Sequence, residues 1–268
     1  MKKQILEKLR EAEFNYKITI LFAIESGSRA WGFPSPDSDY DVRFIYKRNL
    51  KDYLRISHVS DFIDVECNAI YDIKGWDIKK ALYLTCQSNT SLYEYVQSPI
   101  HYIHYPDFEN ELKALIWAQF QPQKLMAHYL GITKKRLMAL EENDTMPLKS
   151  LFYALRSVLA ALWIKTNQTV PPMAFQALAI FIPNEINIRI QELIILKGTV
   201  DEKHCVEYDE VIMHWIKTTY DTLKLTYKNL PISTVDTDAL DDFFHQTITH
   251  EINDKRFKGE SPHLTGMH

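Results

Sequence analysis

The sequence predicts an α+β protein in which a small mixed sheet flanked by helices is followed by an all-helical part. Two observations lead to this prediction. Strand-like runs, either apolar or alternating, lie before about residue 103, whereas helical periodicity prevails from Asp107 onward. The composition suits one large or two modest globular domains, because 46% of the 268 residues are apolar and 25% are charged.

The first part of the chain alternates between helical and strand patterns. Residues 3–14 place Ile5, Leu9 and Ala12 on one side of an amphipathic helix. We expect a helical turn at 28–31 and strands at 17–24, 42–46, 62–67 and 68–73. Asp77 is a good N-cap for a helix that runs through Leu84.

The second part is predicted to be helical throughout. The expected helices cover residues 107–119, 122–142, 148–165, 172–181, 184–197, 205–229 and 237–251. The change in character predicts one domain over 1–105, a helical domain over 106–258 and a frayed polar tail over 259–268.

Charge and cysteine usage restrict the function classes. A net charge of −4 gives no global basic field for nucleic acid, although Lys134, Lys135 and Arg136 form a local basic run. Three scattered cysteines are expected to be reduced thiols, as in a cytoplasmic protein, and no spacing of Cys and His indicates a zinc site. The charged N-terminus does not resemble a signal peptide, and no apolar run approaches the roughly 20 residues that span a membrane.

The most informative pattern joins a glycine-serine turn to a pair of acids. Gly27 and Ser28 end an apolar strand-like run, and such turns bind phosphate through backbone N–H groups. Asp39 and Asp41 open the next strand, and alternation places both on one face, where they can bind one hard cation. Ser-Pro-Asp-Ser-Asp is also ordinary turn composition, so the acids alone would be a weak signal.

The string from Glu25 to Tyr46, Glu-Ser-Gly-Ser-Arg-Ala-Trp-Gly-Phe through Asp-Ser-Asp-Tyr-Asp-Val-Arg, resembles the DNA polymerase beta nucleotidyltransferase superfamily. More closely, it is similar to the RlaP-like, YcgL-like branch that is associated with RNA repair pathways. Three later segments extend the resemblance: residues 75–82, 91–100 and 149–156. The resemblance implies a polymerase-beta-type nucleotidyltransferase domain, followed by the helical domain, which closes one side of the active-site cleft.

The resemblance also implies roles for individual residues. Asp39 and Asp41 would bind the metals, and a third acid on a neighbouring strand would complete the catalytic site. Asp72 is the first choice for that acid, both as a catalytic residue and as a third metal ligand, with Asp64 and Glu66 as alternatives. The third acid would act as a general base or orient the attacking hydroxyl.

Six further residues are expected to bind the nucleotide: Gly27, Ser28, Arg29, Lys149, Tyr153 and Arg156. By resemblance, the Gly-Ser turn holds the phosphates, although Ser28 is also a common helix cap. Lys149, Tyr153 and Arg156 lie at i, i+4 and i+7 and so share one helix face, which is either a solvated stripe or a set of groups that reach the triphosphate. Trp31 and Phe33 suit packing better than base stacking.

The expected activity is Mg²⁺-dependent transfer of a nucleoside monophosphate from an NTP to a hydroxyl, with release of pyrophosphate. ATP is the expected NTP, and Mn²⁺ is the alternative cation. An RNA terminus is the favoured acceptor, whereas a protein side chain (AMPylation) or a small molecule remains open. The non-enzymatic alternative is a catalytically idle nucleotide-binding or regulatory module, which has no chemical need for intact acids.

Overall fold

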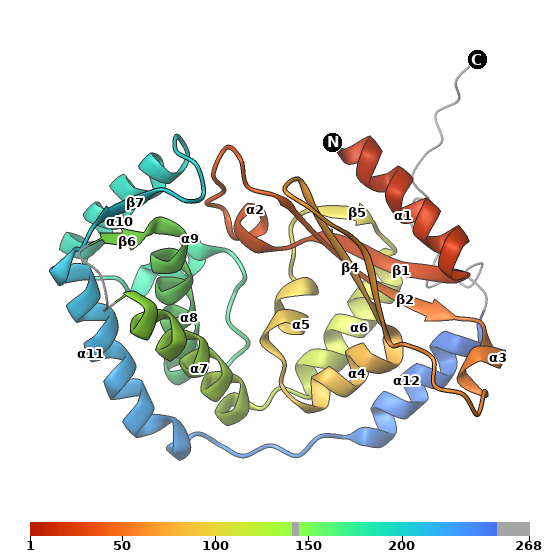
Figure 1. Cartoon of the computed structure of the whole chain (residues 1–268). Coiled ribbons are helices and arrows are strands. Elements are labelled where there is room, and N and C mark those ends of the chain that lie inside the picture. The colour runs from red at the N-terminus through yellow and green to blue at the C-terminus, as the bar shows by residue number, and fades with distance from the viewer. Residues whose placement is uncertain (141–144, 251–268) are drawn as a thin grey trace.

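The computed structural model describes residues 1–140 and 145–250 and confirms the α+β class. A mixed five-stranded sheet lies in the first half of the chain, and helices fill most of the second half (Figure 1). The predicted tail over 259–268 lies outside the described residues. None of the helices in the described part combines the length and apolar character needed to cross a bilayer.

The elements of the first half follow the predicted order closely. They are α1 (Lys2–Tyr16), β1 (Ile18–Glu25), α2 (Gly27–Trp31), β2 (Tyr40–Arg48), α3 (Leu50–Tyr53), β3 (Phe62–Cys67), β4 (Tyr71–Asp77), α4 (Ile78–Cys86), α5 (Thr90–Tyr95) and β5 (His101–Ile103). Only the short elements α3, α5 and β5 were not expected, since three to six residues carry too little periodicity to identify.

The sheet order β3-β4-β2-β1-β5 determines which strand ends meet. β2 is antiparallel to β1 and parallel to β4. The C-terminal end of β1 therefore lies beside the N-terminal ends of β2 and β4. The predicted Gly-Ser turn and acid pair meet at this end of the three strands.

The second half consists mainly of helices. Its elements are α6 (Pro106–Ala118), α7 (Pro122–Leu140), β6 (Thr145–Pro147), α8 (Leu148–Asn167), α9 (Phe175–Leu178), η1 (Ala179–Phe181), α10 (Asn184–Lys197), β7 (Cys205–Glu207), α11 (Glu210–Thr226), η2 (Tyr227–Asn229) and α12 (Thr237–Thr249).

Two of the predicted helices were partly wrong. Residues 205–207 form a strand that pairs with Thr145–Pro147, a contact 60 residues distant that local periodicity does not report. The helix expected over 172–181 begins only at Phe175, because Pro171 and Pro172 keep the backbone before it extended.

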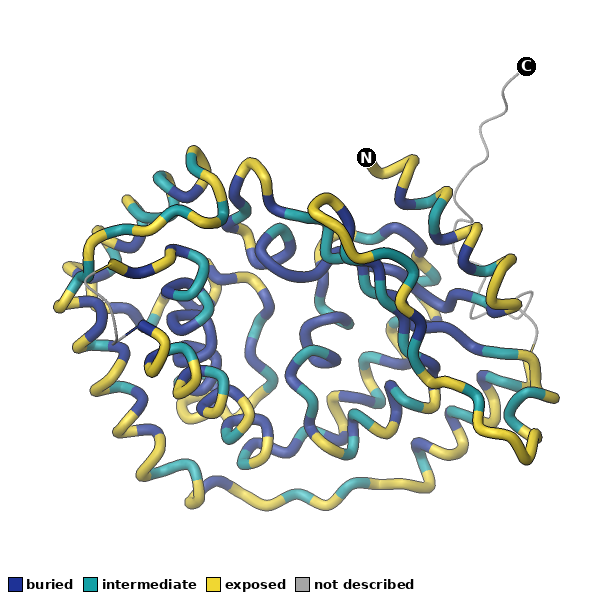
Figure 2. Tube along the Cα trace, in the orientation of Figure 1, coloured by how far each residue is buried: buried dark blue, intermediate teal, exposed yellow. Residues whose placement is uncertain are grey.

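The hydrophobic core extends across both halves of the chain. Its larger cluster includes Leu21 of β1, Ala30 of α2 and Leu92 of α5 together with Leu151 of α8 and Ile216 of α11. A smaller cluster lies between α1 and the other face of the sheet. Figure 2 shows buried segments in both parts. The division at 105/106 therefore stays a prediction, and it does not separate two cores.

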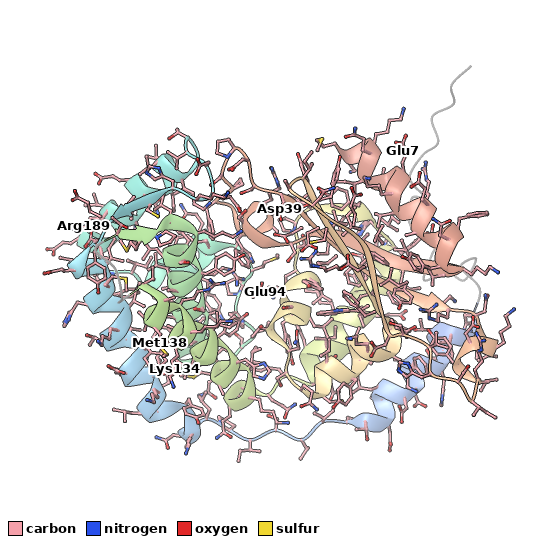
Figure 3. The ribbon with its side chains drawn as sticks, viewed as in Figure 1. Glu7, Asp39, Glu94, Lys134, Met138 and Arg189 are labelled. Atoms are coloured by element: carbon pink, nitrogen blue, oxygen red, sulfur yellow. The ribbon has the colours of Figure 1, made fainter. Side chains whose placement is uncertain are left out.

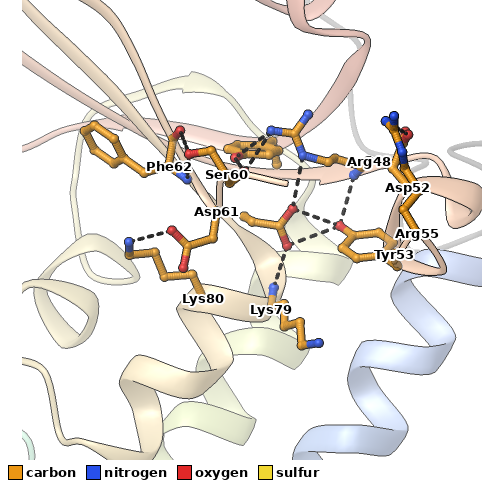
Figure 4. A network of polar contacts seen from close by, with 11 residues as sticks. Arg48, Asp52, Tyr53, Arg55, Ser60, Asp61, Phe62, Lys79 and Lys80 are labelled. Atoms are coloured by element: carbon orange, nitrogen blue, oxygen red, sulfur yellow. Dashed lines mark hydrogen bonds and ion pairs between the residues drawn. The ribbon is translucent and has the colours of Figure 1, made fainter. Parts of the chain in front are cut away.

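The last helix returns to the first half. α12 packs against α4 and β2, and the Lys47 Nζ donates to the Thr247 carbonyl at 2.9 Å (Figure 1). At the same end of the sheet, Asp77 caps α4 as predicted, since its carboxylate accepts from the Lys79 N–H at 2.9 Å. Tyr53 also donates to this carboxylate (Figure 4). This polar network lies at the end of β2 and β4 opposite to the predicted acids.

Candidate active site

The structure brings Asp41 and Asp72 together through strand register. β2 and β4 run parallel, and Asp41 is the direct partner of Asp72 across the ladder. The alternatives Asp64 and Glu66 lie on β3, one strand farther away, where Glu66 forms an ion pair with Lys8. The geometry thus favours Asp72 as the third carboxylate of the group.

Gly27 is required at its position for two reasons. Its φ of +60° lies in the left-handed region, and a Cβ there would overlap the Asp41 carboxylate. The Ser26 N–H donates to the Asp41 carbonyl at 2.8 Å, which joins the turn to β2. The turn that begins α2 therefore lies directly against one of the two predicted metal ligands.

Glu25 is buried behind this turn. Its side chain accepts hydrogen bonds from the Asp41 N–H at 3.0 Å and from the Tyr102 hydroxyl, and the residue is 1% exposed. Burial raises the pKa of Glu25 from 4.5 to about 7. Glu25 thus holds the backbone of Asp41 through a carboxyl group that titrates near neutral pH.

A fixed cation lies between the carboxylates. The Arg43 Nη2 donates to Asp41 Oδ1 at 2.9 Å and to Asp72 Oδ2 at 2.6 Å. The Lys74 Nζ lies 2.6 Å from the other Asp72 oxygen. Although Asp72 is partly desolvated, its hydrogen bond with Lys74 and the charge of Arg43 lower its pKa.

Ser28 belongs to a hydrogen-bonded chain that reaches the helical half. Its hydroxyl donates to the Ser38 Oγ at 3.2 Å, and Ser38 in turn donates to Glu202 Oε1 at 2.9 Å. The other oxygen of Glu202 accepts from the Lys149 Nζ at 2.7 Å. Through this chain, the loop before β7 connects the Gly-Ser turn to the first turn of α8.

The two predicted metal ligands lack a full set of opposing charges. Partial burial raises the pKa of both Asp39 and Asp41, and the negative charges of neighbouring acids raise both pKa values further. Lys149 lowers the pKa of both groups, and so its ammonium lies within electrostatic reach of them. The pair is therefore suited to an added cation.

The donor set fits Mg²⁺, which prefers carboxylate oxygens at sites that keep room for substrate phosphates. Asp39 and Asp41 offer such oxygens, and Asp39 makes no ion pair within the described part of the chain. Asp72 fits less well, because Arg43 and Lys74 already contact both of its oxygens.

Arg29 holds the loop that carries Asp39. Its Nε donates to the Asp39 carbonyl at 3.1 Å and its Nη2 to the Ser38 carbonyl at 2.5 Å, and its guanidinium lies 4.2 Å from the centre of the Tyr40 ring. These contacts place Arg29 near the acids, but its guanidinium is already bound to the loop backbone and lies over the Tyr40 ring.

Tyr153 and Arg156 occupy different environments on α8. Tyr153 is within electrostatic reach of Asp41, and its ring packs edge-on against Trp31. Arg156 is buried, donates to Glu94 Oε1 at 2.7 Å and to the Met173 carbonyl, and lies over the Trp31 ring. The structure thus brings Lys149 and Tyr153 toward the acids, whereas the contacts of Arg156 are with Glu94, Met173 and Trp31.

Glu94, on α5, is the common hydrogen-bond acceptor for Arg156 and for two aromatic side chains. It accepts hydrogen bonds from Trp31 Nε1 at 3.1 Å and from the Tyr129 hydroxyl at 3.1 Å, in addition to Arg156. Figure 3 labels Glu94 on α5 and Asp39 in the loop before β2. A cavity of about 250 Å³ lies beside Glu94, and its lining includes Tyr153 and Arg136, whose guanidinium is 4.7 Å from the Tyr153 ring centre.

Sequence reasoning gave no role to Glu25, Arg43, Glu94 or Glu202. Two of them had a usable signal: Glu25 is an acid that ends a buried apolar strand, and Arg43 follows Asp41 by two residues and therefore shares its face. Glu202 had none, since it lies 164 residues from the Ser38 that it contacts. The packing of Phe33 agrees with expectation, since its ring stacks on Phe152.

A family model and a curated relative both match this chain over most of its length. Residues 1–246 match the family model described as RlaP, the RNA repair pathway DNA polymerase beta family. The chain is 34% identical over 232 residues to the "Uncharacterized protein YcgL" of Bacillus subtilis (strain 168), covering 86% of this chain and 89% of that protein. A solved nucleotidyltransferase-like protein from Exiguobacterium sibiricum 255-15 aligns over 91% of this chain and 79% of its own, with 9% identity and a TM-score of 0.31.

Proposed function

The chain belongs to the RNA repair pathway DNA polymerase beta family, and we propose that it transfers a nucleoside monophosphate from an NTP to a hydroxyl acceptor. Pyrophosphate is the second product. The bond between the α-phosphorus and its bridging oxygen to the β-phosphate breaks, a bond from the acceptor oxygen to the α-phosphorus forms, and the acceptor proton passes to solvent.

One observation carries the proposal. Asp41 and Asp72 are paired across parallel strands, and the glycine of the Gly-Ser turn lies against the Asp41 carboxylate without room for a side chain. A turn with free N–H groups beside oxygen ligands suits an Mg²⁺–triphosphate, which needs donors and carboxylates a few ångströms apart.

Asp39 and Asp41 would hold Mg²⁺, with Mn²⁺ as the alternative. When bound, the cation would neutralise phosphate oxygens and help to align the reacting groups. The raised pKa values of both acids would fall once a cation is near, which provides affinity for it.

Asp72 completes the site in a different way. A general base is most effective with a pKa near the working pH, whereas Arg43 and Lys74 hold the pKa of Asp72 below its usual value. We therefore assign Asp72 the role of orienting Arg43, which in turn orients Asp41. Asp72 would also accept a hydrogen bond from the acceptor hydroxyl.

The triphosphate is assigned to the Gly27–Ser28 turn and to Lys149. Lys149 is the cation of the helical half that acts on both acids, and its pairing with Glu202 can be exchanged for phosphate. Tyr153 would contact the nucleoside beside the cavity of about 250 Å³. Arg156, which is buried against Glu94, is assigned to positioning Trp31 and not to the phosphates.

An RNA terminus is the proposed acceptor, and the family description supports it. The test uses each of the four NTPs labelled on the α-phosphate, with ATP as the expected donor, in Mg²⁺ and with an RNA oligonucleotide that ends in a free hydroxyl. The control RNA has its terminal hydroxyls blocked. The proposal predicts a labelled RNA product with the free terminus alone.

Other outcomes identify other acceptors. Label on a protein would indicate AMPylation, and label on a small molecule would indicate a different acceptor class. NTP binding without pyrophosphate release under any of these conditions would contradict the proposed transfer and favour a nucleotide-binding regulatory module.

A further inference from the structure

Two histidines and a glutamate converge at the β5 edge of the sheet, on the other side of β1 from the strands that carry Asp41 and Asp72. His101 lies on β5, His104 follows that strand directly, and Glu109 lies in the first turns of α6. The His101 Nε2 is 3.1 Å from one Glu109 oxygen, and the His104 Nδ1 is 2.8 Å from the other. The possible ligand atoms of all three residues lie within 4.8 Å of one another.

The chemistry of this group differs from that of the aspartate site. Imidazole nitrogens bind Zn²⁺ and similar transition metals well, whereas Mg²⁺ prefers oxygen ligands alone. We propose that His101, His104 and Glu109 form a binding site for a divalent transition metal, with Zn²⁺ as the expected ion.

The geometry is close to what such an ion requires. Ligands bound at about 2.0–2.1 Å in a tetrahedral arrangement are about 3.3 Å apart. The two nitrogen–oxygen distances of 3.1 and 2.8 Å are near that value, and all of the possible ligand atoms lie within 4.8 Å of one another. Two imidazoles and one carboxylate leave a fourth position for water.

The surroundings hold the ligands in place. The Tyr105 N–H donates to Glu109 Oε1 at 2.9 Å, and this orients the carboxylate toward the histidines. The backbone of His101 is fixed by its pairing with Ile24 of β1. His104 is the most exposed of the three, with 47% of its side chain accessible, and so an ion can enter from solvent.

The position of the site indicates its role. It connects β5, an edge strand, to α6, the first helix after the predicted division at 105/106. The intervening Tyr102 points to the other face of the strand and donates to Glu25. A bound ion would therefore link β5 to α6 and stabilise β5, whose Tyr102 donates to Glu25.

The test measures Zn²⁺ and Co²⁺ binding to the full-length protein after removal of bound metal. We expect one equivalent to bind, a Co²⁺ absorption spectrum of tetrahedral or five-coordinate type, and a melting temperature that rises by several degrees in Zn²⁺. His101→Asn and Glu109→Gln should each weaken binding at least tenfold.

Two controls separate this site from other metal sites. His58→Asn removes an exposed histidine elsewhere and should leave binding unchanged. The double variant Asp39→Asn/Asp41→Asn should also retain Zn²⁺ binding, which distinguishes a failure here from a failure of the proposed transferase site. Absence of stoichiometric binding, or binding that persists in His101→Asn, would overturn the proposal.

Discussion

Glu25 illustrates how a single buried residue can link the fold to the site. It ends β1, fixes the backbone of Asp41 and accepts a hydrogen bond from the hydroxyl of Tyr102 on β5. Among the residues that the structure describes, none forms an ion pair with Glu25, so burial of its ionised carboxylate is unfavourable and the stability of the fold depends on its protonation. The pKa of about 7 places that change within the range of ordinary experiments.

The folded-state pKa of Glu25 is above its unfolded value of 4.5, so the folded protein binds the proton more tightly. The free energy of unfolding should therefore fall as pH rises from about 4.5 to about 7. Between pH 5 and pH 8 the loss is about 2–3 kcal/mol. Urea unfolding at both pH values measures it.

Glu25→Gln should remove this contribution, so that the variant loses less stability than the wild type between the two pH values. Glu7→Gln, at an exposed position of α1, is the matched control (Figure 3). If Glu25→Gln and the wild type showed the same pH dependence, the titration would belong to another group.

The Ser28 hydroxyl is the side-chain group that is assigned to the phosphates in the Gly-Ser turn. Ser28→Ala should weaken NTP binding by about 1–2 kcal/mol, the contribution of a hydrogen bond to a charged group. A titration with a non-hydrolysable NTP in Mg²⁺ measures the change. Ser60→Ala, at the opposite end of the sheet, should not change NTP affinity. Equal NTP affinities for Ser28→Ala and wild type would mean that Ser28 does not bind the phosphates and serves only as part of α2.

Among elements, α5 and α8 are joined by a buried ion pair. The side chains of Arg156 and Glu94 are 5% and 9% exposed, and Trp31 of α2 contacts both. The sequence predicted the helix face of Lys149, Tyr153 and Arg156, but one face of a helix can contact both a cleft and a core. The partner of Arg156 is 62 residues away and is invisible to local periodicity.

Arg156→Ala should lower the free energy of unfolding by about 3–5 kcal/mol, because it leaves the Glu94 charge buried without its partner. Adding Glu94→Gln should recover part of that loss. Arg189→Ala, which breaks a solvent-exposed pair with Asp209, should cost less than about 1 kcal/mol. A stable Arg156→Ala protein with lost turnover would instead support direct action on the phosphates.

Local patterns predicted the long elements well and the short ones poorly. The helix at 184–197 and the strand at 62–67 agree to the residue, because each has a clear period and a clear boundary. β6 and β7 have three residues each and exist only through their pairing with each other. The parallel pairing of Asp41 with Asp72 likewise depends on sheet order, which periodicity does not determine.

For the whole molecule, the shared core predicts cooperative unfolding. Side chains from β1, α2 and α5 belong to one cluster with those of α8 and α11. We therefore expect a single urea transition that coincides by far-UV circular dichroism and tryptophan fluorescence. Tryptophans report on both halves, with Trp31 and Trp76 in the first and Trp117, Trp163 and Trp215 in the second. Two separate transitions would indicate independently stable domains at the 105/106 division.

The aspartate group is proposed to catalyse nucleotidyl transfer. The most direct measurement follows NTP labelled on either the α- or the γ-phosphate, in Mg²⁺ with acceptor RNA, for wild type, Asp41→Asn and Asp64→Asn. We predict that α-label enters the RNA while γ-label leaves as pyrophosphate. Asp41→Asn should lower the rate more than about 100-fold with the fold intact, whereas Asp64→Asn on β3 should match wild type. Near-wild-type turnover by Asp41→Asn, or release of γ-label as inorganic phosphate without transfer of α-label, would contradict the account.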